Sequence, residues 1–442
     1  MTTARALIPP LPRRAWIFLA GNGLSALGTG MVLPFFVIYF HQGRGMPLEV
    51  AALGLSVLAF FGFVGGLGAG PFVDRAGGRL AMVGFLVVSA AGSVLTAWAH
   101  ETWQMFVAAA MMGAGISGFW PSLSAVFATI VPREQTSAVF AVHYMTLNAG
   151  IGAGGIVGGL IVDVARVETF QAVYLLDAAT FLLFAGLLVF FMKDIGARLE
   201  RAAEERRDQG GYREVLKDRR FRRVVFLMVL LVTIGYSQLT AAFPVFATGI
   251  GGVSTRVVGL AFGVNTFMVV AAQLFVLRFL EGRRRTRAVA ILSLLWALCW
   301  GLTLLAGHAG GGSLAAAGFM AAMALFALGE TFVSPTMAPM VNDLAPKHLL
   351  GRYMSLHTLS WSVGEVAGPA VAGAALGAGR STLFFLSLIA ACGVAAVLAL
   401  RLERCLPPEA NVVRSAANED AGTPPETGIT TVVTHETAGQ EL

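Results

Sequence analysis

The chain has 442 residues, of which 56% are apolar and only 13% are charged. Soluble domains carry about 25% charged residues, and so much apolar surface cannot be hidden in one core, so the composition predicts an integral membrane protein. The net charge of +6 comes from Lys and Arg spread through short loops. We interpret it as an orientation signal and expect no nucleic-acid partner. The three cysteines form neither a disulfide framework nor a metal-ligand spacing.

Twelve apolar segments of roughly 20–27 residues are each long enough to cross the hydrocarbon core as a helix. Helices are expected because they satisfy every backbone hydrogen bond within one segment. The first segment is too long for the core of a signal peptide, so it counts as a span. The expected spans are 15–40, 48–72, 79–99, 103–130, 136–162, 170–192, 221–248, 255–279, 287–307, 313–343, 349–376 and 380–401.

The basic residues predict the orientation. If the N-terminus lies in the cytoplasm, only four of the 31 Lys and Arg residues fall on the outer side, namely Arg44, Arg166, Arg256 and Arg380. Cytoplasmic loops collect positive charge. We therefore expect a multi-pass protein of the cell's inner (plasma) membrane with both termini in the cytoplasm.

A charged stretch in the middle divides the spans into six plus six. We expect a cytoplasmic N-terminus (1–14), a first six-helix bundle (15–192), a cytoplasmic linker (193–220), a second bundle (221–401) and a tail (402–442). An interfacial helix is expected near Tyr212–Arg223. The tail is rich in Pro, Thr, Glu and Gly, which predicts disorder.

The two halves resemble each other in sequence. Placed without a gap, Pro121 aligns with Pro335 and His143 with His357. The same alignment pairs Pro132 with Pro346, Arg133 with Lys347, Gly150 with Gly364, Gly154 with Gly368 and Gly159 with Gly373. A parallel duplication of six-helix units predicts a transporter whose halves rock around a site at their interface.

A short polar hinge, Gly70–Arg79, separates spans 2 and 3, and Leu280–Arg287 is its degraded counterpart between spans 8 and 9. With twelve spans and a central linker, the hinge resembles the loop signature of the major facilitator superfamily. The residues that match the signature are Gly70, Asp74, Arg75, Gly77 and Arg79, while Gly78 stands where a basic residue is usual.

The resemblance covers roughly residues 14–402. It implies an all-α membrane protein with twelve transmembrane helices in two six-helix bundles related by a pseudo-two-fold axis. It further implies that Asp74 holds the inner end of span 2 against the start of span 11, near Gly351 and Arg352, and so gates the cytoplasmic side.

Other stretches resemble the drug:proton antiporter branch of the superfamily, which exports many drugs. They are Leu328–Pro335, Ala345–Met354 and the span-5 glycine motif of Gly150, Gly154, Gly158 and Gly159. Two positions depart from that branch. Gly155 replaces a usual Pro, and span 4 has Ala109 and no Arg ahead of Gly113, which leaves arginine-assisted proton transfer open.

Three acids lie inside the expected spans: Asp177, Glu330 and Glu365. An ionised side chain at the centre of a membrane helix costs roughly 2.5–3.5 kcal/mol, and these spans hold no Lys or Arg at mid-depth. We therefore expect the acids to be protonated part of the time, as a proton-coupled carrier requires. The alternative is a neutral carboxyl group that hydrogen-bonds a neighbouring helix.

Other polar and aromatic side chains admit two interpretations. His143 and His357 either relay protons near neutral pH or join helices. Asn22, Asn148, Gln238 and Asn265 either line a substrate cavity or join helices. Tyr236, Trp120 and Trp361 either face a lipophilic substrate or pack.

The leading hypothesis is a secondary active transporter that exports small lipophilic or cationic compounds by alternating access. No phosphate-binding Gly-x-x-x-x-Gly-Lys-Ser/Thr motif occurs, so we expect the proton gradient as energy source, no cofactor and no metal. The expected partners are a small-molecule substrate and the lipid bilayer, and the protein is expected to be a monomer and not an enzyme. The alternatives are a carrier that imports a sugar, peptide or lipid-like metabolite, and a polytopic membrane enzyme or sensor.

Overall fold

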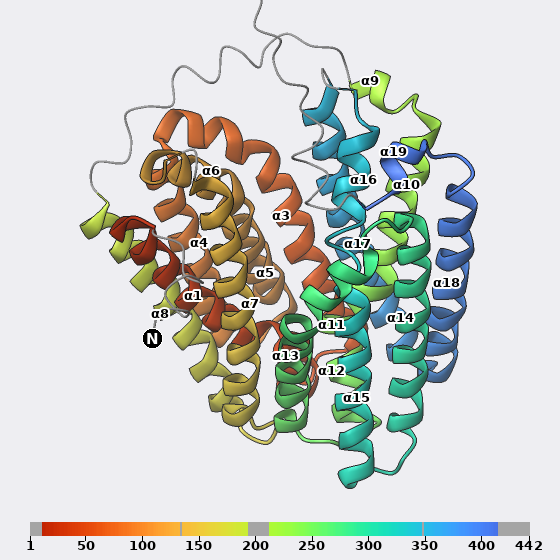
Figure 1. Cartoon of the computed structure of the whole chain (residues 1–442). Coiled ribbons are helices and arrows are strands. Elements are labelled where there is room, and N and C mark those ends of the chain that lie inside the picture. The colour runs from red at the N-terminus through yellow and green to blue at the C-terminus, as the bar shows by residue number, and fades with distance from the viewer. Residues whose placement is uncertain (1–10, 133–134, 193–211, 347–348, 414–442) are drawn as a thin grey trace, which may run out of the picture.

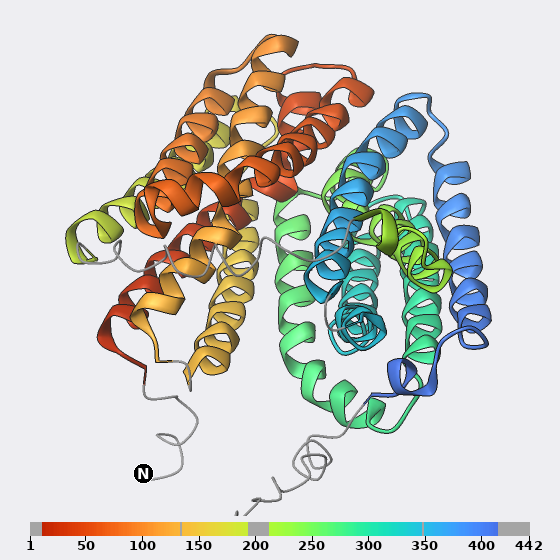
Figure 2. The ribbon, with the colours of Figure 1, turned by 90° about the horizontal axis from the view of Figure 1, so that it is seen from above.

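The structure is a computed structural model that describes residues 11–132, 135–192, 212–346 and 349–413 (Figure 1). Its elements in this part of the chain are helices, with two isolated β-bridges as the only extended pairing described. Ten of the described helices are long and apolar enough to cross a membrane. The predicted all-α membrane fold is confirmed, and Figure 2 shows its two halves as separate groups of helices.

The N-terminal half contains every expected span. Its first span changes along its length from α-helix through a 3-10 turn to a π-helical end. This first span consists of α1 (Arg13–Val32), η1 (Leu33–Phe35), α2 (Phe36–Ile38) and η2 (Tyr39–Gly43). The other helices are α3 (Leu48–Ala76), α4 (Gly78–Trp98), α5 (Thr102–Ser117), α6 (Phe119–Ile130), α7 (Thr136–Ile161) and α8 (Val167–Phe191).

The expected polar hinge is mostly helical. Helix α3 continues through Ala76, and Gly77 alone makes the turn into α4 with a φ of 79°. Only glycine adopts this left-handed backbone without strain. Asp74, Arg75 and Arg79 therefore lie in the two helices on either side of a tight turn rather than in a loop of ten residues.

The C-terminal half begins after residues 193–211, which lie outside the described residues. Its first elements are α9 (Tyr212–Val215), α10 (Arg219–Leu231), η5 (Val232–Tyr236), α11 (Ser237–Ala241) and α12 (Phe243–Gly249). Then follow α13 (Thr255–Leu280), α14 (Arg285–Gly307), α15 (Gly312–Glu330), α16 (Met337–Leu344), α17 (Leu350–Gly377), α18 (Ser381–Leu402) and α19 (Pro408–Asn411). Asp218 starts α10, because its carboxylate accepts hydrogen bonds from the backbone N–H groups of Arg220 and Phe221.

Two expected spans are absent from the ten helices counted above. The fourth is divided at Gly118 into α5 and α6, and the eleventh, α17, is lowered in hydropathy by residues such as His357 and Glu365. The tenth span is divided too, between α15 and α16. The alignment of Pro121 with Pro335 also superimposes these two breaks and the starts of α7 and α17 at Thr136 and Leu350, so the repeat seen in the sequence is present in the helices.

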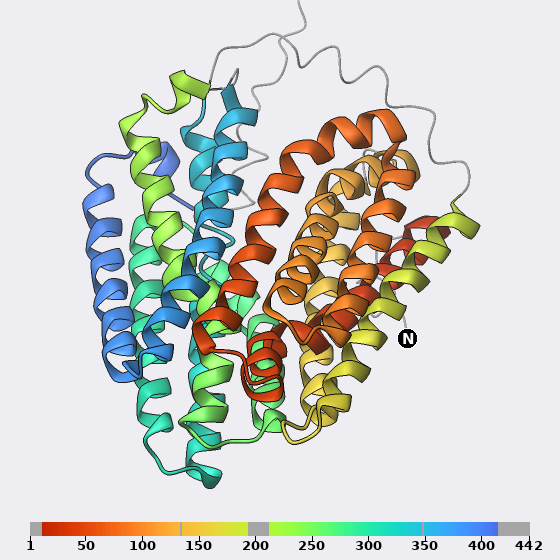
Figure 3. The same cartoon turned by 180° about the vertical axis from the view of Figure 1, so that it is seen from behind.

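The halves touch at one end of the molecule, which we call the outer end because it carries the four arginines expected outside. There, Gly159 of α7 packs against Gly259 of α13, and Gly373 of α17 packs against Ala52 of α3. Thr255 Oγ1 donates a hydrogen bond of 2.6 Å to the carbonyl oxygen of Val162. Toward the opposite, inner end the ribbons of α3 and α17 diverge (Figures 1 and 3).

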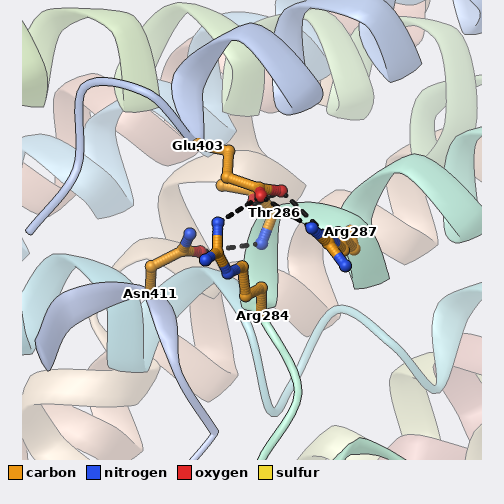
Figure 4. A network of polar contacts seen from close by, with 5 residues as sticks. All are labelled: Arg284, Thr286, Arg287, Glu403 and Asn411. Carbon is orange, nitrogen blue, oxygen red and sulfur yellow. Dashed lines mark hydrogen bonds and ion pairs between the residues drawn. The ribbon is translucent and has the colours of Figure 1, made fainter. Parts of the chain in front are cut away.

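The chain after α18 is ordered further than expected. We predicted disorder from residue 402, yet Glu403 accepts hydrogen bonds from Arg284 and Arg287, and Asn411 Oδ1 accepts one of 3.0 Å from the backbone N–H of Thr286 (Figure 4). The arginine-rich turn before α14 needs carboxylate partners, and the chain after α18 supplies one. Residues 414–442 lie outside the described residues.

Candidate functional site

Four spans of the C-terminal half bring together Glu330, Glu365, Tyr236 and Asn265, which we call the acid site. Glu330 is the last residue of α15, and Glu365 lies in α17; both are half-buried. Tyr236 interacts electrostatically with both carboxyl groups. Asn265 of α13 lies beside Glu330, and its side-chain amide interacts with this carboxyl group. The prediction of two acids near mid-span therefore corresponds to one shared environment.

Glycines next to these residues set their positions. A Cβ on Gly235 or on Gly329 would overlap the ring of Trp296, so both glycines press directly against this side chain of α14. Tyr236 and Glu330 follow these glycines in the sequence and are thereby held next to each other. Gly364, which precedes Glu365, packs in the same way against Val232 of η5. The absence of a side chain at these positions lets the helices approach closely.

Irregular backbone surrounds the acid site. Tyr236 ends a π-helical turn, a feature that often occurs at functional sites. Glu330 ends α15, and six residues in turns follow before α16 begins. Thr331 Oγ1 donates a hydrogen bond of 2.6 Å to the carbonyl of Leu328 at this break. Broken helices are how many transporters form their binding sites. The span expected at 313–343 is therefore not continuous, and Pro335 is a signal in the sequence for this break.

Aromatic rings form one wall of the acid site. The ring of Tyr236 lies 4.6 Å from that of Trp361 and 5.5 Å from that of Trp296. Trp361 is half-buried and lies one helical turn before Glu365. Aromatic faces beside carboxylates attract organic cations. The side chain of Trp120, the third expected aromatic, is outside the described residues.

Two more predicted residues lie on elements that form the acid site. Gln238 Nε2 donates hydrogen bonds to the carbonyl oxygens of Thr233 (2.7 Å) and Gly368 (3.3 Å), so it joins α11 to α17. His357 of α17 is half-buried, and its Nε2 has no hydrogen-bond partner among the described residues. The first therefore joins helices, and the second keeps a buried imidazole nitrogen without a hydrogen-bond partner in the described ranges.

The predicted polar residues of the N-terminal half lie elsewhere, in three separate sets of contacts. Asp177 is fully buried in α8 and accepts a hydrogen bond of 2.7 Å from Ser93 Oγ of α4. The buried pair Asn22 and His143 joins α1 to α7 through Nδ2 and Nδ1, 3.1 Å apart. Asn148 is exposed and donates to the carbonyl oxygen of Tyr144 in its own helix. The structure thus does not bring these residues into the acid site.

The span-5 glycines place α7 between the two halves. Gly150, Gly154 and Gly158 lie against the backbone of α1, and Gly159 lies against α13. Gly155, which stands where the related branch has Pro, faces Phe262 of α13. The motif therefore supports close packing on both sides of one helix.

The gating loop is described in part. Arg79 donates hydrogen bonds of 2.9 Å to the carbonyl oxygens of Leu188 and Val189, so it fastens α4 to the end of α8 within one half. Arg75 is exposed and Arg352 half-buried. The side chain of Asp74 and the surroundings of Gly70 and Gly351 lie outside the described residues, so the latch between Asp74 and Arg352 stays a prediction.

Comparison with known proteins identifies the family. The sequence model of the Major Facilitator Superfamily matches residues 18–317 and 250–436. The chain belongs to this superfamily. As a superfamily member it is a multi-pass membrane transporter, as its helices and their repeat independently indicate.

Several curated superfamily members match most of the chain. A Na(+), Li(+), K(+)/H(+) antiporter of Planococcus maritimus is 26% identical over 79% of this chain and 87% of its own. The multidrug resistance protein MdtH of Cronobacter sakazakii is 26% identical over 83% of this chain and 87% of its own. Among solved structures, a POT family transporter in complex with 5-aminolevulinic acid superimposes with a TM-score of 0.72 over 90% of this chain and 96% of its own, at 16% identity. This last likeness shows the superfamily fold alone.

Proposed function

We propose that the protein is a proton-coupled exporter of small lipophilic cations. The observation that carries the proposal is the acid site: two carboxyl groups with a shared neighbour, Tyr236, partly open and beside aromatic rings. Within the described ranges, no Lys or Arg forms an ion pair with either carboxyl group. A carboxylate in a membrane interior without a cation requires a proton or a cationic substrate.

Competition between these two positive charges would couple their movements. With the site open to the inner side, a substrate cation displaces protons from Glu330 and Glu365 and places its apolar part against Trp361. With the site open to the outer side, protons from the more acidic medium displace the cation. The two halves would alternate between these states by rocking about their glycine-packed contact. In this scheme the structure, whose halves meet at the outer end, would represent the inward-open state.

The related proteins support this reading, since one is named for multidrug resistance and another for the exchange of monovalent cations against protons. Exchange of an alkali cation is a second candidate, because carboxylate and amide oxygens of Glu330, Glu365 and Asn265 are hard-cation ligands. The rings of Tyr236 and Trp361 favour an organic cation, because aromatic faces bind such cations well. We place the protein in the inner membrane as a monomer with both termini in the cytoplasm.

Efflux of ethidium from cells that express the protein tests the proposal. We expect efflux that stops when a protonophore collapses the proton gradient. Efflux that continues at the same rate would contradict proton coupling. Release of Na⁺ or K⁺ against a gradient, without any transport of ethidium or other lipophilic cations, would favour the second candidate.

A further inference from the structure

Two groups of arginines lie at the inner end of the C-terminal half, and they differ in how their charge is balanced. In the first group, Arg284 and Arg287 meet Glu403, and Arg285 meets Asp343 at 2.7 Å. The second group lines a cavity of about 530 Å³ between α10 and α18, which lie side by side (Figures 1 and 3). Its members are Arg219, Arg222, Arg223 and Arg401.

The four cavity arginines have no acidic partner within the described ranges. None of them forms an ion pair there, and no Asp or Glu lines the cavity. Two acids next to these arginines in the sequence are engaged elsewhere, since Asp218 accepts a hydrogen bond of 2.9 Å from the Tyr353 hydroxyl and Glu403 binds the first group of arginines. Four like charges around one cavity repel one another, so an anion placed between them would be stabilised.

The cavity changes from polar to apolar along the direction of the spans. Phe226 and Leu227 lie one helical turn deeper than Arg222 and Arg223, and Leu398 lies one turn deeper than Arg401. Phe226 is 60% exposed. Because α10 begins and α18 ends at the inner end, the arginines lie where hydrocarbon meets water and the apolar residues lie within the hydrocarbon. Such a cavity fits a ligand with an anionic head and an apolar continuation.

We propose that this cavity binds an anionic phospholipid of the inner leaflet. The arginines would hold the phosphate, for which the planar guanidinium group is well suited. The first part of an acyl chain would lie along Phe226 and Leu398. Basic pockets between spans on the cytoplasmic side are where phospholipid headgroups bind. The bound lipid would join the first and last spans of the C-terminal half, and this inference does not depend on the proposed transport activity.

A matched pair of double variants tests the site. Arg222→Gln with Arg401→Gln removes two charges from the cavity, while Arg220→Gln with Arg404→Gln removes two exposed charges from the same two helix ends outside it. Binding of phosphatidylglycerol to the purified full-length protein is measured by native mass spectrometry, with phosphatidylcholine and inorganic phosphate as comparison ligands. We expect the cavity variant to bind phosphatidylglycerol about tenfold or more weakly, and the control less than about twofold.

Equal weakening in both variants would overturn the proposal, because it would indicate general surface charge. Inorganic phosphate that binds as tightly as phosphatidylglycerol would overturn it too, because a free anion uses none of the apolar wall. Unchanged binding of phosphatidylglycerol in the cavity variant would also overturn the proposal, because the cavity arginines would then not hold the lipid.

A second measurement uses the wild-type protein and so needs no variant to fold. Cys405 lines the cavity, where Arg223 Nη1 lies 2.7 Å from its sulfur, whereas Cys299 and Cys392 are buried among helices. We expect phosphatidylglycerol, but not phosphatidylcholine, to slow the alkylation of Cys405 by the uncharged reagent iodoacetamide several-fold. An alkylation rate that is the same with both lipids would contradict binding at this cavity.

Discussion

The two halves of the protein each hold an acid inside a span, in opposite surroundings. Asp177 of the N-terminal half is fully buried and receives a hydrogen bond from Ser93. Glu330 and Glu365 of the C-terminal half are half-buried and share Tyr236 as a neighbour. An enclosed acid joins helices, whereas an acid that water or a ligand can reach is able to exchange its proton. Access, rather than depth in the membrane, separates the two kinds of site.

The histidines of the repeat show the same difference. His143 and His357 occupy equivalent places in α7 and α17. In the N-terminal half, His143 is fully buried and forms a hydrogen bond with Asn22. In the C-terminal half, His357 is only half-buried. One half therefore serves as the more closed frame, and we expect the other to carry the proton chemistry.

Removal of the open acids should have the largest effect on transport. Glu330→Gln and Glu365→Gln keep the size of each side chain but cannot bind and release a proton. We expect each variant to lose at least about tenfold in export driven by a proton gradient. The measurement is uphill ethidium transport, with protein abundance in the membrane as the control. Full activity in both variants would remove the two residues from the mechanism.

The positioning of Glu330 should be the next most sensitive feature. Gly329→Val places a side chain against Trp296, which is fully buried and cannot move aside. We expect a loss of about 1–3 kcal/mol in stability, together with transport reduced several-fold.

The double variant Gly329→Val with Trp296→Leu tests whether contact with Trp296 causes the loss. It makes room for the valine and should regain part of the lost transport. No recovery in the double variant would mean that the glycine acts in some other way than through contact with Trp296.

The enclosed acid should affect stability and leave coupling intact. Ser93→Ala removes the hydrogen bond to Asp177 and should lower stability by about 1 kcal/mol. The pH dependence of transport should not change, because we expect this enclosed acid to exchange no proton during the cycle. Thermal unfolding in detergent and transport at several pH values measure the two effects. A shifted pH profile would place Asp177 in the proton pathway.

The acid that follows the last span should have the smallest effect, with a known sign. Hydrogen bonds from Arg287 and Arg284 hold the pKa of Glu403 below its usual value of 4.5. A lowered pKa stabilises the folded protein above that value, and the stabilisation disappears as pH falls through the pKa of the folded state. Glu403→Gln should therefore cost at most about 1 kcal/mol at neutral pH. Unfolding temperatures of variant and wild type should converge below pH 4.5; a constant difference would contradict the ion pairs.

The sequence was sufficient for the all-helical membrane fold, the repeat and the presence of Glu330 and Glu365 within the C-terminal half, because long apolar runs and rare charges within them have few interpretations in a membrane. It was not sufficient for the neighbours of those acids. Tyr236 lies near both carboxyl groups because Gly235 and Gly329 pack against Trp296. This contact involves three helices that are far apart in the sequence. The ordered path of the chain up to Val413 depends on pairing between Glu403 and the arginines at the start of α14, which composition alone could not indicate.

Transport by the purified protein in sealed vesicles tests the central claim most directly. Vesicles that enclose DNA report the arrival of ethidium by its fluorescence, and a jump in external pH sets a proton gradient with an acidic interior. The account predicts that wild-type protein accumulates ethidium while the gradient lasts, and that Glu330→Gln and Glu365→Gln only equilibrate it. Accumulation by the variants equal to that of the wild type, or accumulation that survives a protonophore, would contradict the account.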